Sequence, residues 1–219
     1  MARLIFEKTG NAVWMSHLDL MRLFQRAFKR AGLALTHTHG FNPRPSVSIA
    51  LPLSVGMESR CELLDFSLNE SDVDFPEIQE RLNAALIPGV HVHQVYDKGR
   101  KIGELSLLRC EIYMHYHAGF SDTACQMIED LFHSKELLVP KKTKNGIQEQ
   151  NIITMIRELD VAATDRHVIT LNCLICCQNP TLNPAQIPLS IEKYLPEMKP
   201  DFYSCRRLEV YDDNKTVFR

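Results

Sequence analysis

The sequence predicts an α+β fold made of two ferredoxin-like halves, each with the element order βαββαβ. Runs rich in β-branched and aromatic residues alternate with amphipathic stretches whose apolar side chains recur every three or four residues. This series of elements occurs once before and once after a polar connector at residues 97–104. We therefore expect two domains, residues 1–98 and residues 104–219, of which the second is decorated with additional segments.

The clearest element of the first half is a helix at residues 16–32. Ser16 can accept backbone amide hydrogens at its start, Asp19 completes a capping box, and Gly32 ends it. Its apolar stripe consists of Leu20, Leu23, Phe24, Ala27, Phe28 and Ala31. The other expected elements are strands at 2–8, 12–16, 46–56, 61–68 and 89–96, a loop at 37–45 and a helix at 74–86.

The second half repeats this alternation less regularly, and the two halves share no residue-by-residue repeat. The expected elements are strands at 106–118, 167–177 and 202–212, helices at 121–134 and within 183–195, and a strand from residue 136 that runs into a basic loop ending at residue 146. Residues 152–163 are amphipathic, and their apolar spacing slightly favours a helix over a strand.

The composition indicates a soluble globular protein. Of the 219 residues, 45% are hydrophobic and 24% are charged, which provides enough apolar chain for a substantial core. The seven cysteines show no regular framework, which favours free thiols in a reducing cytoplasm. No apolar run reaches the roughly 18–20 residues of a transmembrane helix, so we expect a cytoplasmic protein without a membrane partner.

Charge is unevenly distributed along the chain. Residues 1–60 carry eight Lys and Arg against three Asp and Glu, whereas residues 61–97 carry one against eight. The net charge of −2 argues against a wholly basic nucleic-acid-binding protein, but a basic face still attracts phosphates.

Three arginines of the expected helix, Arg22, Arg26 and Arg30, lie four residues apart and therefore share one side of it. Each step advances about 6 Å, which is close to the spacing of successive phosphates. Guanidinium groups bind phosphate oxygens bidentately, and Arg44 in the following loop adds a fourth such group. We hypothesise that these arginines bind a nucleic-acid backbone. The alternative is a solvated helix face with a local Asp19–Arg22 ion pair.

The loop at residues 37–45 is predicted to be stiff and to carry a binding side chain. Its conformation is set by Gly40, Pro43 and Pro45. Phe41 is predicted to stack on a base that Asn42 orients, as aromatic platforms do in single-strand binding. The alternative for Phe41 is a plug that attaches the loop to the core.

Two basic segments are predicted to add non-specific attraction for phosphates. They are the loop containing Lys141, Lys142 and Lys144, and the connector residues 98–101. For each segment taken separately, an ordinary solvated loop is an equally good interpretation.

The histidines suggest a catalytic alternative. His17, His37 and His39 converge if the start of the helix folds against the loop, and two imidazoles can act as acid and base in metal-independent RNA cleavage or ligate a metal. Two further pairs are His91/His93 and His115/His117. No carboxylate or cysteine lies at a characteristic spacing near them, so we predict no metal site. We expect His17 to be structural or to position a substrate.

The stretches SHLDLMRLFQRAFKRAGL and GFNPRPSVSIALPLSVGMESRCELLDFSL resemble the radical-SAM-linked protein family, a domain family of unknown function. The residues that carry the resemblance are Ser16, His17, Leu18, Asp19, Arg22, Gly40, Phe41, Asn42, Pro43, Pro45, Pro52, Leu53, Gly56, Glu62 and Asp65. The similarity is dense over residues 1–70 and weak beyond them.

The resemblance implies a domain that is often fused to, or encoded beside, a cobalamin-binding radical SAM protein. Neighbouring genes commonly concern ribosomal proteins and a ribonuclease of the E/G type, which suggests RNA as substrate or partner. Radical SAM enzymes hold an iron–sulfur cluster through cysteines on a loop, whereas Cys173, Cys176 and Cys177 lie in an apolar strand-like run. We therefore expect a non-catalytic companion without a cofactor of its own.

The favoured hypothesis is an RNA-binding or substrate-presenting accessory protein that works with a cobalamin-dependent radical SAM enzyme in RNA modification or processing. One alternative is a metal-independent ribonuclease that uses His17 with His37 or His39. The other is a protein-docking scaffold that binds through the acidic residues 62–80 and does not contact RNA.

Overall fold

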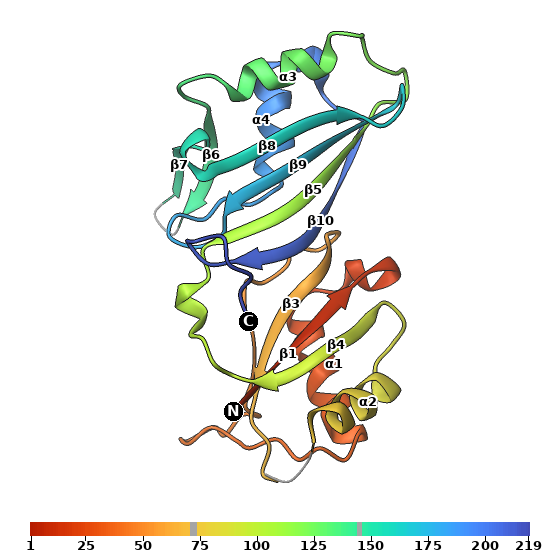
Figure 1. Cartoon of the computed structure of the whole chain (residues 1–219), viewed down its shortest axis with the longest axis vertical. Coiled ribbons are helices and arrows are strands. Elements are labelled where there is room, and N and C mark those ends of the chain that lie inside the picture. Colours follow the sequence, from red (N-terminus) through yellow and green to blue (C-terminus); the bar gives the residue numbers. More distant parts are fainter. Residues whose placement is uncertain (71–73, 144–145) are drawn as a thin grey trace. The chain divides into compact units, whose positions relative to one another are not determined.

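The chain forms two compact α+β units, which confirms the predicted fold class (Figure 1). The computed structural model describes residues 1–70, 74–143 and 146–219, except for the side chains of residues 142 and 143. The first unit spans Met1–Ile102, together with Arg219, and the second spans Gly103–Phe218.

The first unit has the element order βαββαβ. Its elements are β1 (Ala2–Lys8), α1 (His17–Arg30), β2 (Val47–Ile49), β3 (Glu58–Phe66), α2 (Phe75–Ala85) and β4 (Val90–Asp97). The strands pair antiparallel in the order β4-β1-β3-β2. This is the ferredoxin-like arrangement that the sequence predicts.

Both helices of the first unit pack on one face of this sheet. Apolar side chains from β1, β3 and β4 form one buried cluster with those of α1 and α2. In this cluster the rings of Phe6 and Phe24 lie 4.7 Å apart, and those of Phe28 and Phe66 lie 4.9 Å apart. The predicted cap of α1 is present, because the Asp19 amide donates to the Ser16 hydroxyl at 3.2 Å.

Two segments of the first unit differ from prediction. Residues 12–16 do not form a strand: Gly10–Trp14 is a 3-10 helix, η1, because the Thr9 amide bonds to the carbonyl of Gly89 at 2.8 Å and the chain turns there. Residues 46–56 contribute only the three residues of β2, since Leu51 has a positive φ of 46° and Pro52 follows it.

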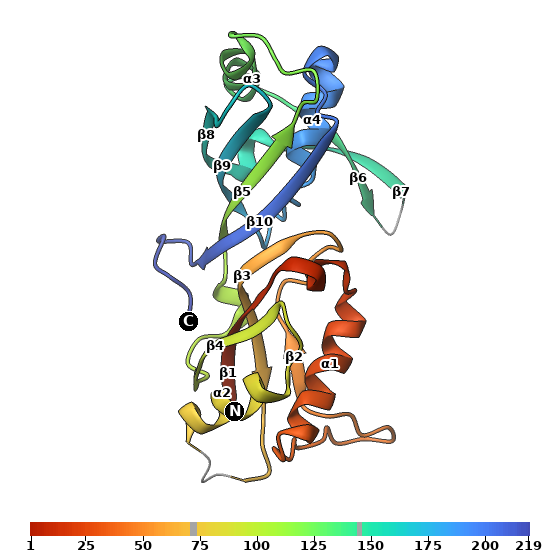
Figure 2. The same ribbon diagram turned by 90° about the vertical axis from the view of Figure 1, so that its right-hand side faces the viewer.

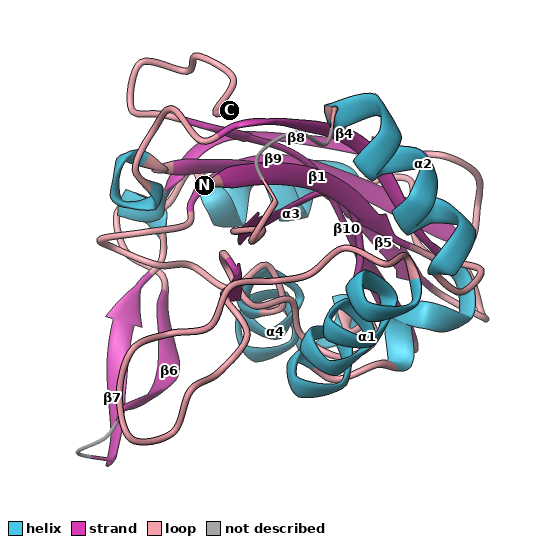
Figure 3. Ribbon diagram, turned by 90° about the horizontal axis from the view of Figure 1, so that it is seen from below, coloured by secondary structure: helices cyan, strands magenta, loops and turns pink. Residues whose placement is uncertain are grey.

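The second unit repeats the topology of the first and adds a hairpin. Its elements are β5 (Leu107–His115), α3 (Ala124–Phe132), β6 (Leu138–Thr143), β7 (Gly146–Asn151), β8 (Ile156–Ala163), β9 (Val168–Cys176), α4 (Gln186–Tyr194) and β10 (Phe202–Tyr211). The main strands follow the order β10-β5-β9-β8, again antiparallel. Figure 3 shows β6 and β7 as a separate pair of strands. The strand β6 was predicted, whereas β7, which pairs with it and makes it a hairpin, was not.

The preference for a helix at residues 152–163 was wrong. The segment begins with a short 3-10 helix, Ile153–Met155, and continues as β8. The buried side chains of Ile152 and Met155 belong to the turn, so the apolar spacing that suggested a helix joined two different elements. The segment is extended from Ile156 onward because its backbone pairs with β9, where Leu159 lies opposite Cys173.

None of the helices in the described ranges combines the length and the apolar character needed to cross a bilayer.

Candidate nucleic-acid interface

Residues 36–46 form a projecting arm whose two sides are joined by hydrogen bonds (orange loop in Figure 2). The Thr38 amide donates to the Arg44 carbonyl at 2.8 Å, and the Arg44 amide donates to the Thr38 hydroxyl at 3.1 Å. Nearer the base, the Ser46 amide donates to the Thr36 carbonyl at 2.8 Å. The predicted loop is therefore a stiff hairpin-like arm.

Phe41 lies at the tip of the arm and is fully exposed, with a relative accessibility of 105%. The alternative interpretation, a plug in the core, does not fit this position. Gly40 has a φ of +136°, which side chains rarely adopt, so the tip depends on glycine. Asn42 is also exposed, so the tip presents one aromatic ring and one amide to solvent.

The three arginines of α1 have different surroundings. Arg22 forms an exposed ion pair with Asp19 at 3.3 Å. The hydrogen bond from the Ser16 hydroxyl, assisted by the charge of Arg22, lowers the pKa of the Asp19 carboxyl. Arg26 is exposed and makes no hydrogen bond or ion pair with any described residue. Arg26 is thus the arginine of α1 with the greatest freedom to bind a phosphate.

Arg30 instead joins the ends of the two helices. Its guanidinium donates to the carbonyl of Ala85 at the end of α2. In return, Arg81 of α2 donates through Nε to the carbonyl of Ala31 at 2.8 Å, just after α1. Each arginine therefore satisfies a carbonyl at the C-terminus of the other helix, where the backbone lacks donors.

This arrangement predicts that Arg30→Ala lowers the free energy of unfolding by about 1 kcal/mol, because a helix-end carbonyl loses its donor. The matched variant Arg26→Ala should change it by less than about 0.5 kcal/mol. Urea denaturation of the two variants measures the difference. Equal stabilities would show that the bond to Ala85 contributes nothing.

The structure does not bring the three candidate histidines together. His17 begins α1, close to the end of the sheet where Lys8 pairs with Ser59. His37 lies at the base of the arm, and the neighbouring Thr36 amide bonds to the carbonyl of Ser67. A strand that runs from residue 59 to residue 67 extends roughly 25 Å, so His17 and His37 lie near opposite ends of the sheet. His39 is further out on the exposed arm.

The other histidine pairs differ from each other. The rings of His91 and His93 lie 5.4 Å apart on β4, as expected for one side of a strand, and His93 is 3.3 Å from Glu7. His115 packs against Phe202, whereas the chain has left β5 at His117. Across the described ranges, no group of three His, Cys, Asp or Glu side chains is placed to hold a metal ion.

The basic segment near residue 141 belongs to the hairpin of the second unit. Lys141 lies on β6, and its ammonium donates to the carbonyl of Thr181 at 3.4 Å. The side chain of Lys142 and the whole of Lys144 lie outside the described residues.

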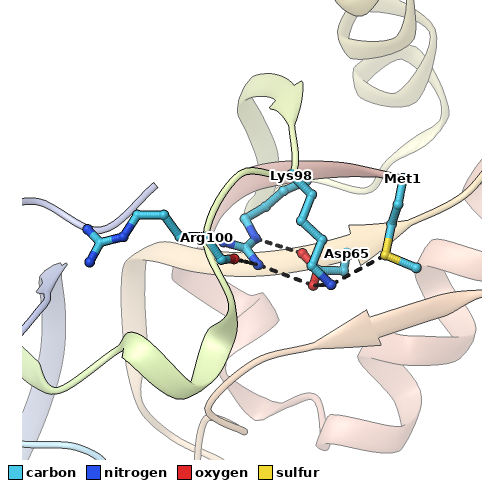
Figure 4. Close-up of polar contacts among 5 residues, drawn as sticks. Met1, Asp65, Lys98 and Arg100 are labelled. Atoms are coloured by element: carbon cyan, nitrogen blue, oxygen red, sulfur yellow. Dashed lines mark hydrogen bonds and ion pairs between the residues drawn. The ribbon is translucent and has the colours of Figure 1, made fainter.

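A buried ion-pair cluster near the base of the arm has no counterpart among the predicted site residues (Figure 4). Arg3 is fully buried and binds Asp65 through two bonds, Nε–Oδ1 at 2.6 Å and Nη2–Oδ2 at 3.2 Å. Lys98 adds a contact of 2.8 Å to Oδ2 of the same carboxylate. Arg3 also donates to the carbonyl of Arg100 at 3.1 Å, which attaches the connector to the sheet.

The strand register explains how this cluster forms. Arg3 lies opposite Tyr96 on one side and Asp65 on the other, and Asp65 lies opposite Ser48. Because the neighbouring residues Leu4 and Leu64 face the helices, this row faces away from them. Burial raises the pKa of the Asp65 carboxyl, but hydrogen bonds from Arg3 and Lys98 outweigh it and hold that pKa below its ordinary value.

The acidic residues 62–80 fall into two groups. Glu62 is buried and Asp65 is paired with Arg3, whereas Glu77 is exposed and pairs with Arg81 at 3.1 Å. Glu70, Asp74 and Glu80 are exposed as well, and Asp72 lies outside the described residues. A sequence signal for the cluster existed: a single arginine within the apolar strand ARLIFEK requires a buried partner, and Asp65 carries part of the family resemblance.

Residues 2–184 match the family described as an uncharacterized protein conserved in bacteria, DUF2344. The chain belongs to this family. No curated protein matches the sequence. Neither the description of the DUF2344 family nor the names of the similar structures link the chain to radical SAM proteins.

Two solved structures are similar to the fold of this DUF2344 chain. A crystal structure of a Cbf5-Nop10-Gar1 complex matches 95% of the chain with a TM-score of 0.53 and 8% identity. A structure of an H/ACA RNP bound to a substrate RNA containing 2'-deoxyuridine matches 94% with a TM-score of 0.50 and 8% identity. The chain covers 48% and 46% of those chains, so it spans about half their length. At this identity the likeness concerns the fold alone.

Proposed function

We propose that this member of the DUF2344 family is an RNA-binding accessory protein that contacts single-stranded RNA through its arm and α1. The observation that carries the proposal is Phe41, a fully exposed ring at the tip of a hydrogen-bonded arm. Exposing a phenylalanine completely leaves its whole apolar area in water, which favours a role in binding a flat partner. Arg44 on the same arm supplies a phosphate-binding group next to it.

The charge of the first 60 residues supports the same proposal. These residues include eight Lys and Arg but only three Asp and Glu. Among the described residues, Arg26 has no hydrogen-bond or ion-pair partner. One of the proteins with a similar fold is an H/ACA RNP bound to a substrate RNA, which agrees with the proposed RNA partner. Arg22 is a further proposed phosphate contact of α1, whereas the guanidinium of Arg30 is bonded to the end of α2. Lys141 of the second unit is proposed separately, as a non-specific phosphate contact of its own unit.

We further propose that the chain assists a cobalamin-dependent radical SAM enzyme in RNA modification or processing. This second proposal rests on the resemblance carried by residues 16–65. A catalytic role as a ribonuclease is less well supported, because His17 lies at the opposite end of the sheet from His37.

The salt dependence of RNA binding tests the proposal. We expect the affinity for single-stranded RNA to fall as salt rises, and the slope of log K against log salt to be smaller by about 1.4 in Arg26→Ala/Arg44→Ala, because two phosphate contacts are lost. Fluorescence anisotropy at several salt concentrations measures this slope.

A matched control removes two exposed arginines of the second unit, in the variant Arg157→Ala/Arg166→Ala. Its net charge changes by the same amount, so it should keep most of the wild-type slope. Identical slopes for both double variants, or no binding at any salt concentration, would contradict the proposed interface.

A further inference from the structure

A pocket of about 570 Å³ lies beside β2, at the base of the arm. Residues 45–51 line one side of it without a gap, and Asp65, Lys98 and Ile102 line another. Thr38 of the arm also contributes to its wall. Its volume lies within the range of small-molecule sites, which is about 300–1,000 Å³.

The pocket exists because β2 carries small residues on the side that faces Asp65. Ser48 is the register partner of Asp65, and side chains alternate along a strand, so Ser46, Ser48 and Ala50 share its face. Their short side chains leave room above the sheet. The larger Ile49 points the other way, into the core with the helices.

Three polar side chains of this pocket, Lys98, Ser46 and Ser48, can donate a hydrogen bond to a ligand. The Lys98 ammonium contacts Asp65 at 2.8 Å and the weakly accepting Met1 sulfur at 3.3 Å, so it retains a donor for a ligand. The hydroxyls of Ser46 and Ser48 make no hydrogen bond with other residues in the part of the chain that the structure describes. Both oxygens of Asp65 already accept bonds.

The charges favour an anionic ligand. Lys98 is the positively charged side chain that lines the pocket, whereas Arg3 is fully buried beneath it and cannot reach a ligand. An anion would accept a charge-assisted hydrogen bond from the Lys98 ammonium. Ile102 and Met1 provide an apolar wall beside the charged end, which suits a ligand that joins a phosphate to a ring.

We infer that this pocket binds one nucleotide, with its phosphate on Lys98 and the hydroxyl of Ser48. Because Thr38 and Pro45 form both the arm and the pocket wall, the nucleotide is either free or a unit of the RNA that the arm holds. The second source rests on the proposed function, whereas the first does not.

Titration with adenosine 5′-monophosphate tests the inference. Lys98→Ala should bind it about 10- to 100-fold more weakly, because a charge-assisted bond to the phosphate is lost. Lys101→Ala removes the same charge from the same connector at a residue that does not line the pocket, and should change affinity by less than about twofold.

A second variant keeps the ion-pair cluster intact. Ser48→Leu fills the pocket from an exposed position on β2 and should also abolish nucleotide binding, with an unchanged melting temperature. Equal affinity of the wild type, Lys98→Ala and Ser48→Leu, or no binding of adenosine 5′-monophosphate to the wild type, would overturn the inference.

Competition with single-stranded RNA identifies the source of the nucleotide. If adenosine 5′-monophosphate displaces the RNA, the pocket takes a unit of the strand; if both bind together, it takes a free nucleotide, and either result supports the site. RNA binding that is unaffected by Lys98→Ala, without any nucleotide binding, would overturn this inference and leave the proposed function standing. Nucleotide binding without RNA binding would do the reverse.

Discussion

Replacing Asp65 by alanine is expected to lower the free energy of unfolding by about 3–5 kcal/mol, because it leaves a buried charge without its partner. The Arg3 guanidinium is fully buried and bonds to both carboxylate oxygens of Asp65. Without Asp65, that buried charge loses the anion that compensates it. Chemical denaturation, followed by circular dichroism, measures the change.

Two variants serve as controls for the effect of Asp65→Ala on stability. Asp97→Ala removes a carboxylate from an exposed position on β4 and should change stability by less than about 0.5 kcal/mol. Arg3→Met/Asp65→Leu removes both charges and should recover most of the lost stability, because an apolar pair can replace a buried ion pair. If Asp65→Ala were as stable as Asp97→Ala, the cluster would not be a stabilising feature.

The same cluster predicts a pH dependence. The pKa of the folded Asp65 carboxyl lies below its ordinary value, so its contribution is complete above about pH 4 and is lost as the pH falls through the folded pKa. Asp65→Asn should therefore show a weaker loss of stability between about pH 4 and pH 2 than the wild type. A wild-type profile identical to that of the variant would contradict this assignment.

The second large effect concerns RNA. Phe41→Ala should weaken single-stranded RNA binding by about 1–3 kcal/mol, or roughly 5- to 150-fold, because one base loses its stacking platform. Stability should stay within about 0.5 kcal/mol of the wild type, since Phe41 has no buried surface to lose. Affinity measurements and thermal denaturation of the same preparations separate the two effects.

Trp14 provides a matched control for Phe41. It is a second aromatic residue with 69% exposure, and it lies on η1 rather than on the arm. Trp14→Ala should therefore leave RNA affinity unchanged. Equal losses in the two variants would indicate general aromatic adhesion instead of a site at the arm.

The local features of the first unit were predictable from its sequence. Ser16 and Asp19 indicate the start of α1, and a single apolar stripe predicts the face that the helix buries. The order of strands and helices follows from such local signals. The topology of the second unit was predictable for the same reason, apart from two strands. β7 was not predicted, and β8 was taken for a helix because the apolar residues of the preceding turn have helical spacing with its own.

The candidate site was predictable only in part. Glycine and proline indicate a loop at the arm, but they do not say whether Phe41 points inward or outward, since that depends on the hydrogen bonds between Thr38 and Arg44. The pair Arg3–Asp65 joins residues 62 positions apart, and its formation depends on the register of β1 and β3. Likewise, the spacing of the α1 arginines could not show that Arg30 meets the end of α2.

Ultraviolet crosslinking of single-stranded RNA to the intact protein, followed by mass spectrometry of the crosslinked residues, tests the central claim most directly. The proposed interface predicts that Phe41 is the main crosslinked residue and that Phe41→Ala removes this crosslink. Crosslinks confined to residues outside 36–46, or an equal yield from the Phe41→Ala variant, would contradict the assignment of the arm as the RNA-binding site.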